Sequence, residues 1–138
     1  MKRKREVIEL NAIDQYIEFY KSITQILKEP CHSLHYDLKK YYPDLWDKIH
    51  IENTSKFQKE LALNIKQGIN EELYRPEINV EFISKTMARF YLNMAEADNK
   101  IISKDDILNI DYHKELAVYH LYGVCTSKGI EYFKNKIK

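Results

Sequence analysis

Glycine and proline are scarce in this chain, with three of each among 138 residues. A fold of many short strands needs these residues at its turns, so their scarcity counts against an all-β protein. Hydrophobic residues make up 44% of the chain and charged residues 31%, which is typical of a globular domain. We therefore expect residues 1–138 to form a single all-α domain, a multi-helix bundle of about five to six helices.

The chain also lacks an excess of charge of either sign, because its formal net charge is only +1. This balance gives no general reason to expect nucleic-acid binding. The basic residues 2–5 are interpreted as a solvated helix end in preference to an arm that binds DNA. The two cysteines, Cys31 and Cys125, lie far apart without the spacing of a disulfide framework, which favours a reducing cytoplasm. No apolar run approaches 18 residues, so we expect a cytoplasmic protein with no membrane contact.

Motifs of catalysis are equally scarce: the sequence has no glycine-rich phosphate loop, no serine elbow and no CxxC pair. The acidic residues of the loop that starts at Asp98 resemble those of a calcium-binding loop. However, Lys100 and Ile102 occupy positions where such loops have oxygen ligands, and Ser103 occupies the position of the glycine that makes the turn. We expect no enzymatic activity, no metal and no cofactor.

A metal site built from histidines is the alternative. Glu29 with His32 and Asp47 with His50 both match an acid-x-x-His spacing, of the kind that di-iron helical bundles use. Pro30 interrupts the first pair, and no inward-facing carboxylate from another helix is evident. A structural or pocket-lining role is therefore favoured for these histidines, including His35 beside Cys31.

Apolar periodicity predicts helices over residues 12–29, 31–42, 43–72 and 79–97. Pro30 ends the first, since proline lacks the N–H that a helix interior needs, and Pro43 suits the first turn of the third. Asn79 is a good N-cap for the fourth helix, and Ser103 is suited to cap a short helical turn through Asp106.

The segment from Asp111 to Lys138 is predicted to form one long helix. One of its faces repeats at a heptad spacing and comprises Tyr112, Leu116, Tyr119, Gly123, Thr126, Ile130, Phe133 and Ile137. Each glycine within a helix costs roughly 1 kcal/mol relative to alanine, so Gly123 and Gly129 suggest the close approach of another helix. The helix at 79–97 carries a similar stripe. We predict a homodimer whose interface contains Met87, Tyr91, Met94, Leu116, Tyr119, Gly123 and Ile130.

Tyrosine is abundant, with eleven tyrosines against five phenylalanines and one tryptophan. Aromatic residues occur on four of the predicted helices. Because a tyrosine ring is apolar and its hydroxyl is polar, this enrichment fits either a cavity for an amphipathic small molecule or a wet interface.

Three stretches of the sequence share a resemblance to one family. They are residues 36–46, from Tyr36 through Pro43 to Trp46; residues 68–79, Gly-Ile-Asn-Glu-Glu-Leu-Tyr-Arg-Pro-Glu-Ile-Asn; and residues 123–129, Gly-Val-Cys-Thr-Ser-Lys-Gly. They resemble parts of regulators of the TetR family. The first resembles the junction between two middle helices, the second the turn after the long helix, and the third the centre of the last helix.

The resemblance implies a bacterial transcriptional regulator with an N-terminal helix-turn-helix domain and a helical domain that dimerises and binds an effector. In that family the last two long helices form a four-helix bundle with those of a second subunit. This chain contains no helix-turn-helix, so DNA would be bound only through a domain that is absent from it. The chain is either one domain of a longer protein or a shortened relative that cannot bind DNA unaided.

By the same resemblance, a small-molecule effector would enter between the first four predicted helices. The residues expected to contact it are Tyr16, Tyr20, His35, Trp46 and Phe90. Two alternative functions remain at this point: a helical metal-dependent enzyme resembling di-iron proteins, and a structural interaction module without a ligand.

Overall fold

The structure is a computed structural model that describes residues 9–27, 37–94 and 101–137. In these residues the regular structure is helical, with one isolated β-bridge between Tyr74 and Cys125, so the predicted all-α bundle is confirmed. Residues 37–41 form a short helix. The other helices are α1 (Ala12–Leu27), α3 (Pro43–Asn70), α4 (Val80–Met94), α5 (Lys104–Ile107), α6 (Ile110–Val124) and α7 (Ser127–Lys134).

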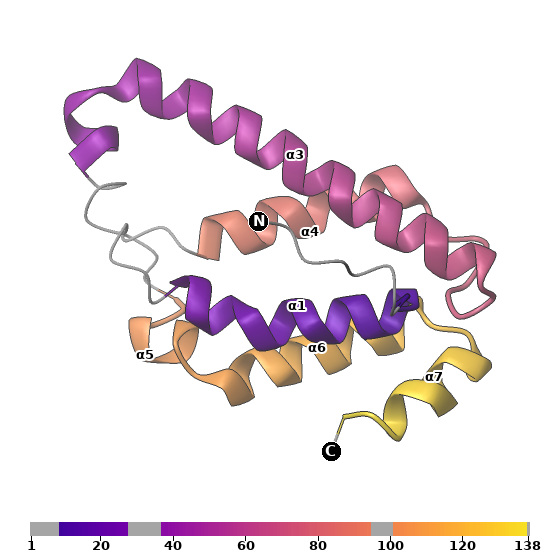
Figure 1. The fold of residues 1–138 in the computed structure, drawn as a ribbon. Coiled ribbons are helices and arrows are strands. Elements are labelled where there is room, and N and C mark those ends of the chain that lie inside the picture. Colours follow the sequence, from indigo (N-terminus) through magenta and orange to yellow (C-terminus); the bar gives the residue numbers. More distant parts are fainter. Residues whose placement is uncertain (1–8, 28–36, 95–100, 138) are drawn as a thin grey trace.

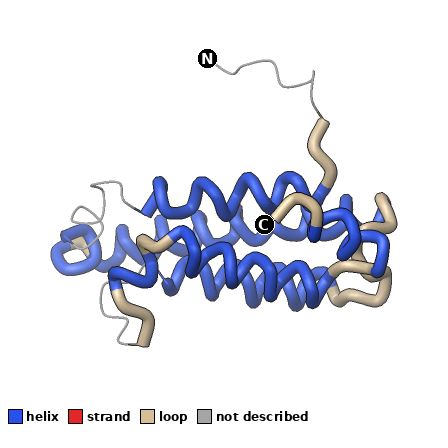
Figure 2. Tube along the Cα trace, turned by 90° about the horizontal axis from the view of Figure 1, so that it is seen from below, coloured by secondary structure: helices blue, strands red, loops and turns tan. Residues whose placement is uncertain are grey.

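The bundle is arranged around α1, which packs against α3 on one side and α6 on the other (Figure 1). Helix α4 packs on α3, and the short α5 packs on the start of α6. Figure 2 shows the long helices running side by side. Within the described residues, none of the helices has both the length and the apolar character needed to cross a lipid bilayer.

Several helices begin at asparagines whose side-chain oxygens accept backbone N–H groups. Asn79 accepts from Phe82 at 3.0 Å, and Asn109 accepts from Asp111 at 2.8 Å. These bonds satisfy N–H groups that have no partner within the helix. The predicted N-cap at Asn79 is therefore confirmed, as is the predicted cap at Ser103, whose hydroxyl accepts the backbone N–H of Asp106 at 3.0 Å.

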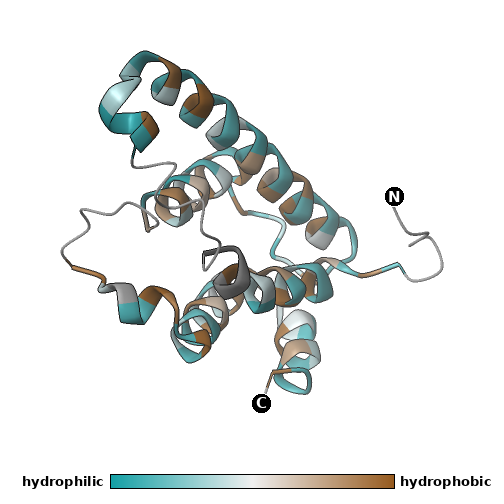
Figure 3. Cartoon of the chain, turned by 60° about the vertical axis from the view of Figure 1, so that its left-hand side comes forward, coloured by the Kyte–Doolittle hydropathy of each residue, from teal (hydrophilic) through white to brown (hydrophobic). Residues whose placement is uncertain are grey.

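Helix α3 extends beyond the bundle. It has 28 residues, or about 42 Å at 1.5 Å per residue, and it begins at Pro43 as predicted. Its buried residues, Leu61, Ile65 and Gly68, all lie in its second half. In its first half Leu45 and Ile51 are exposed, and Figure 3 shows brown apolar segments alternating with teal ones along this free end. The bundle core therefore supports only the second half of α3.

The prediction of one continuous helix over residues 111–138 is wrong. Helix α6 ends at Val124, and α7 begins at Ser127. The two residues between them are extended, with ψ 150° at Cys125 and ψ 174° at Thr126. The heptad spacing of the apolar residues continues across this break in the sequence, so another part of the chain must decide where the helix ends.

That part is the turn between α3 and α4, which forms hydrogen bonds with the break. The backbone N–H of Arg75 donates to the carbonyl oxygen of Val124 at 2.8 Å, and its guanidinium Nε donates to that of Gly123 at 3.1 Å. In return, the N–H of Thr126 donates to the carbonyl oxygen of Leu73 at 2.9 Å. The last carbonyls of α6 thus find partners outside the helix, which stabilises an end at Val124.

The two glycines near the α6–α7 break differ in how closely other parts of the chain approach them. A Cβ at Gly129 would lie 2.2 Å from the carbonyl oxygen of Leu73, so the close approach predicted there exists, although it involves the α3–α4 turn rather than another helix. A Cβ at Gly123 would meet nothing within 4 Å. Gly123 therefore faces open space in the single chain.

Candidate functional site

Helices α1, α4 and α6 bring three polar aromatic side chains together in the core. The hydroxyls of Tyr16 and Tyr91 share a hydrogen bond, and the ring of His120 stacks on that of Tyr16 with centroids 4.4 Å apart. All three residues are buried. Because the three residues come from different helices, this cluster connects the helices through both ring packing and a polar contact.

Burial controls the ionisation of this cluster. Loss of hydration raises the pKa of Tyr91 to about 12 and raises that of Tyr16 well above its ordinary value, with the neighbouring Tyr91 adding to the effect. The same loss lowers the pKa of His120 to about 4. All three groups are therefore neutral near pH 7, and the cluster can offer hydrogen bonds and ring surfaces but no charge.

A second buried histidine lies at the start of α6. His113 contacts the carbonyl oxygen of Ile107 through Nε2 at 2.6 Å, and since a carbonyl only accepts, Nε2 carries the hydrogen. This bond ties α5 to α6. The Nδ1 of His113 is buried without a hydrogen-bond partner.

The predicted effector-binding residues are only partly brought together. Tyr16 and Tyr20 are buried on α1, and Phe90 lies beside Tyr91 with ring centroids 5.7 Å apart. Trp46 lies instead on the free first half of α3, where its ring stacks on His50 at 5.2 Å. His35 lies outside the described residues. The structure thus places Tyr16 and Phe90 around one cluster, and Trp46 belongs to neither of the described core clusters.

The predicted dimer residues fall into two groups. Tyr91 and Met94 are buried in the core of the single chain, and Ile130 on α7 is partly buried against it. The other residues remain accessible to a partner: Tyr119 and Gly123 are exposed, and Met87 and Leu116 are half-buried. Helix α6 therefore provides most of the predicted interface that a second subunit could reach.

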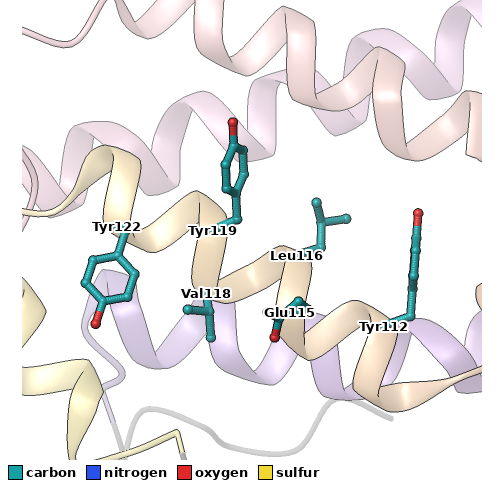
Figure 4. A pocket seen from close by; sticks show the side chains of 6 residues that line it. All are labelled: Tyr112, Glu115, Leu116, Val118, Tyr119 and Tyr122. Atoms are coloured by element: carbon teal, nitrogen blue, oxygen red, sulfur yellow. The ribbon is translucent and has the colours of Figure 1, made fainter.

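The outward side of α6 carries an open depression of about 480 Å³. All six lining residues belong to this one helix (Figure 4), with Tyr112, Leu116 and Tyr119 on one flank and Glu115, Val118 and Tyr122 on the other. Tyr119 is 80% exposed and Tyr122 is 49% exposed. Since a single helix cannot enclose a small molecule, this depression is a surface suited to a macromolecular partner.

Sequence reasoning missed His120 and His113 as core residues. The signal was available, because His113, Ala117, His120 and Val124 follow a 4-3-4 spacing, and this stripe is the buried one. Helix α6 is apolar nearly all round, so periodicity alone did not indicate which side faces the core. Glu115, Val118 and Tyr122 were also missed as members of the outward face.

Metal ligation finds no support in the part of the chain that the structure describes, where no three histidine, cysteine, aspartate or glutamate side chains are grouped for an ion. His50, from one of the acid-x-x-His pairs, is engaged in the stack with Trp46. The other pair, Glu29 and His32, lies outside the described residues together with Cys31.

No protein-family model, curated protein or solved structure matches this chain. The class that the coordinates define is an all-α multi-helix bundle with a neutral polar cluster in its core and a tyrosine-rich outward face on α6.

Proposed function

We propose that this chain is the dimerisation and effector-sensing domain of a bacterial, cytoplasmic regulator of the TetR type. In this proposal, two copies associate through α6 and the adjoining side of α4. DNA is bound through a helix-turn-helix domain that these 138 residues do not contain.

The outward face of α6 is the observation that carries this proposal. Large apolar or amphipathic side chains cover it, and Tyr119 leaves 80% of its surface in water. On the α4 side, Met87 and Leu116 are half-buried against the same core cluster and extend the face. A face on which large apolar and tyrosine side chains surround one carboxylate, that of Glu115, is typical of protein interfaces, where tyrosine and methionine are enriched.

The positions of the family-like stretches bear on this proposal in two ways. Residues 123–129, which resemble the centre of the family's last helix, contain the break between α6 and α7, and here the chain departs from the family's pattern. Two of them, residues 68–79 and 123–129, lie against each other at the turn and the helix break, joined by the Tyr74–Cys125 bridge and the bonds of Arg75. The described part of the third, residues 37–46, contains a short helix and the start of α3, as expected for a junction between helices. Residues 68–79 and 123–129 thus share one structural task, whereas residues 37–46 lie at the other end of α3.

Effector sensing is assigned to the cluster of Tyr16, Tyr91 and His120. Its groups are neutral near pH 7, so the ligand class that suits it is an uncharged amphipathic molecule that accepts hydrogen bonds and stacks on aromatic rings. Because the cluster joins α1, α4 and α6, a ligand that separates these side chains would shift the population of bundle arrangements and, with it, the geometry of the dimer.

The packing of this cluster also favours a second candidate, an interaction module without a ligand. The two tyrosine hydroxyls bond to each other, and Phe19 packs edge-on against Tyr91 at 5.1 Å. A core filled in this way has no need of a bound molecule.

Association through α6 is tested by the oligomeric state of Tyr119→Glu, measured by light scattering at micromolar concentration. The matched control is Leu63→Glu, since Leu63 is 66% exposed but lies on α3. We expect a dimer for the unmodified chain and for Leu63→Glu and a monomer for Tyr119→Glu, because a buried, unpaired carboxylate opposes the contact. A monomeric unmodified chain would overturn the dimer proposal.

Effector sensing is tested by a thermal-shift screen with uncharged amphipathic compounds. A compound that stabilises the unmodified chain but not Tyr16→Phe supports the regulator. A screen without any stabilising compound favours the ligand-free module. Elemental analysis checks the enzyme alternative, which requires stoichiometric metal.

A further inference from the structure

We infer that the second copy docks on α6 in an antiparallel register centred on position 117, so that the carboxylate of Glu115 accepts a hydrogen bond from the hydroxyl of Tyr119 of the partner subunit, and the reverse. This inference rests on the proposed dimer and specifies its geometry. The contact occurs twice across a two-fold axis.

Helix geometry places both residues at the centre of the outward face. Ala117 is fully buried, so the direction opposite to it points away from the core. At 100° per residue, Glu115 and Tyr119 each lie roughly 20° from that direction, on either side of it. At 1.5 Å per residue, they lie about 3 Å before and after the level of position 117.

A two-fold axis perpendicular to α6 at this level brings Glu115 to the same height as the Tyr119 of the partner subunit. The remaining four lining residues are also spaced equally about position 117, in the pairs Tyr112 with Tyr122 and Leu116 with Val118. The two-fold axis therefore brings each residue to the height of the other member of its pair on the partner subunit. A parallel pair would place Glu115 against the partner subunit's Glu115, and like charges facing each other would oppose association.

Tyr119 suits the carboxylate better than the other two tyrosines of the face. The ring of Tyr112 packs on His113 at 5.3 Å, and the ring of Tyr122 packs edge-on against Phe133 at 5.0 Å. Tyr119 is the most exposed of the large hydrophobic side chains on α6. Its hydroxyl can therefore reach across the interface without breaking a ring contact within its own chain.

Cysteine cross-linking tests the register. Three double variants are oxidised side by side in the full chain with Cys31→Ser: Glu115→Cys with Tyr119→Cys, Glu115→Cys with Tyr112→Cys, and Glu115→Cys with Tyr122→Cys. The Cys31→Ser chain alone is the control. Dimers covalently linked by disulfides are measured on non-reducing gels, and light scattering under reducing conditions establishes that each variant still associates.

Each pair is oxidised at a protein concentration at which light scattering shows its reduced form to be dimeric, because substitutions at positions 115 and 119 weaken association. Under this condition we expect the 115/119 pair to form the covalent dimer most rapidly and completely. Faster cross-linking of either other pair overturns the register while leaving association through α6 intact. Reduced variants that associate without any pair cross-linking place the interface elsewhere, whereas a monomeric unmodified chain would contradict the proposed function itself.

Hydrogen-bond variants give an independent measurement. Tyr119→Phe should raise the dimer dissociation constant roughly tenfold or more, because two bonds to a charged acceptor are lost per dimer. Tyr122→Phe, the matched control, should change the constant by less than about threefold. Equal effects of the two substitutions would contradict the Glu115–Tyr119 contact.

Discussion

The imidazole of His120 is a buried, neutral base stacked on Tyr16, and this makes the stability of the bundle depend on pH. In the folded chain burial holds its pKa at about 4, whereas an unfolded histidine takes up a proton near pH 6.5. Between these values the unfolded chain binds more protons than the folded one, so stability rises with pH.

We predict that the free energy of unfolding falls as the pH is lowered from 6.5 to 4, with His120 contributing a loss of up to about 3 kcal/mol. Urea denaturation at several pH values measures this loss. The control is His120→Phe, which keeps a ring against Tyr16 but cannot bind a proton. Its stability should depend less on pH in this window, and an identical dependence would show that His120 is not responsible.

The hydrogen bond between Tyr16 and Tyr91 allows a second prediction at this scale. Tyr91→Phe should destabilise the chain by about 1–3 kcal/mol, because it leaves the buried hydroxyl of Tyr16 without its partner. Replacing both tyrosines by phenylalanine removes the unsatisfied group. The double variant should therefore lose less stability than the sum of the two single variants in chemical denaturation, and simple additivity would argue against coupling between them.

At the scale of elements, the two glycines near the α6–α7 break have opposite surroundings. Gly129→Ala should destabilise the chain by about 2 kcal/mol or more, since the added methyl group collides with the carbonyl oxygen of Leu73. Gly123→Ala should stabilise the single chain by up to about 1 kcal/mol, because the position is helical and open. Thermal denaturation compares the two, and equal effects would contradict the difference in packing.

Gly123 also lies on the side of α6 that we propose for the dimer. A larger side chain there, Gly123→Leu, should weaken association if a second subunit approaches this backbone closely. Light scattering measures the effect, with Gly123→Ala as the smaller step. Unchanged association of Gly123→Leu would exclude a close contact at this position.

Thr126 is the residue that connects the break to the turn. Its hydroxyl accepts the N–H of Gly129 at 3.1 Å, which caps α7, and donates to the carbonyl oxygen of Glu72 at 2.9 Å. We predict that Thr126→Val, which keeps the shape but loses the hydroxyl, costs about 1–2 kcal/mol in chemical denaturation. Thr126→Ser should retain most of the stability, and a similar loss in both variants would point to packing instead.

At the scale of the whole molecule, association should link stability to concentration. For a dimer of this chain length, each tenfold increase in protein concentration should raise the thermal midpoint by about 2 °C, because the folded dimer is favoured by mass action. Tyr119→Glu should have a midpoint independent of concentration. Calorimetry over a hundredfold range measures both, and a constant midpoint for the unmodified chain would indicate an unassociated fold.

The sequence by itself determined the features of this fold that depend on neighbouring residues. Composition and periodicity predicted the all-α bundle, Pro43 marked the start of α3, and Asn79 and Ser103 marked helix caps. Each of these signals acts within a few residues of the chain. The predicted end of the helix at 79–97 lies outside the described residues beyond Met94.

Only the tertiary structure decided where α6 ends and which of its sides is buried. The break at Cys125 and Thr126 depends on hydrogen bonds from Arg75 and to Leu73, about fifty residues earlier in the chain, which no local pattern contains. From Leu116 onwards helix α6 is apolar nearly all round, so the choice of Ala117, His120 and Val124 as its inner stripe follows from contacts with α1. The tyrosine-rich outward face is the consequence of that choice, because the side left uncovered by α1 is the one available to a partner.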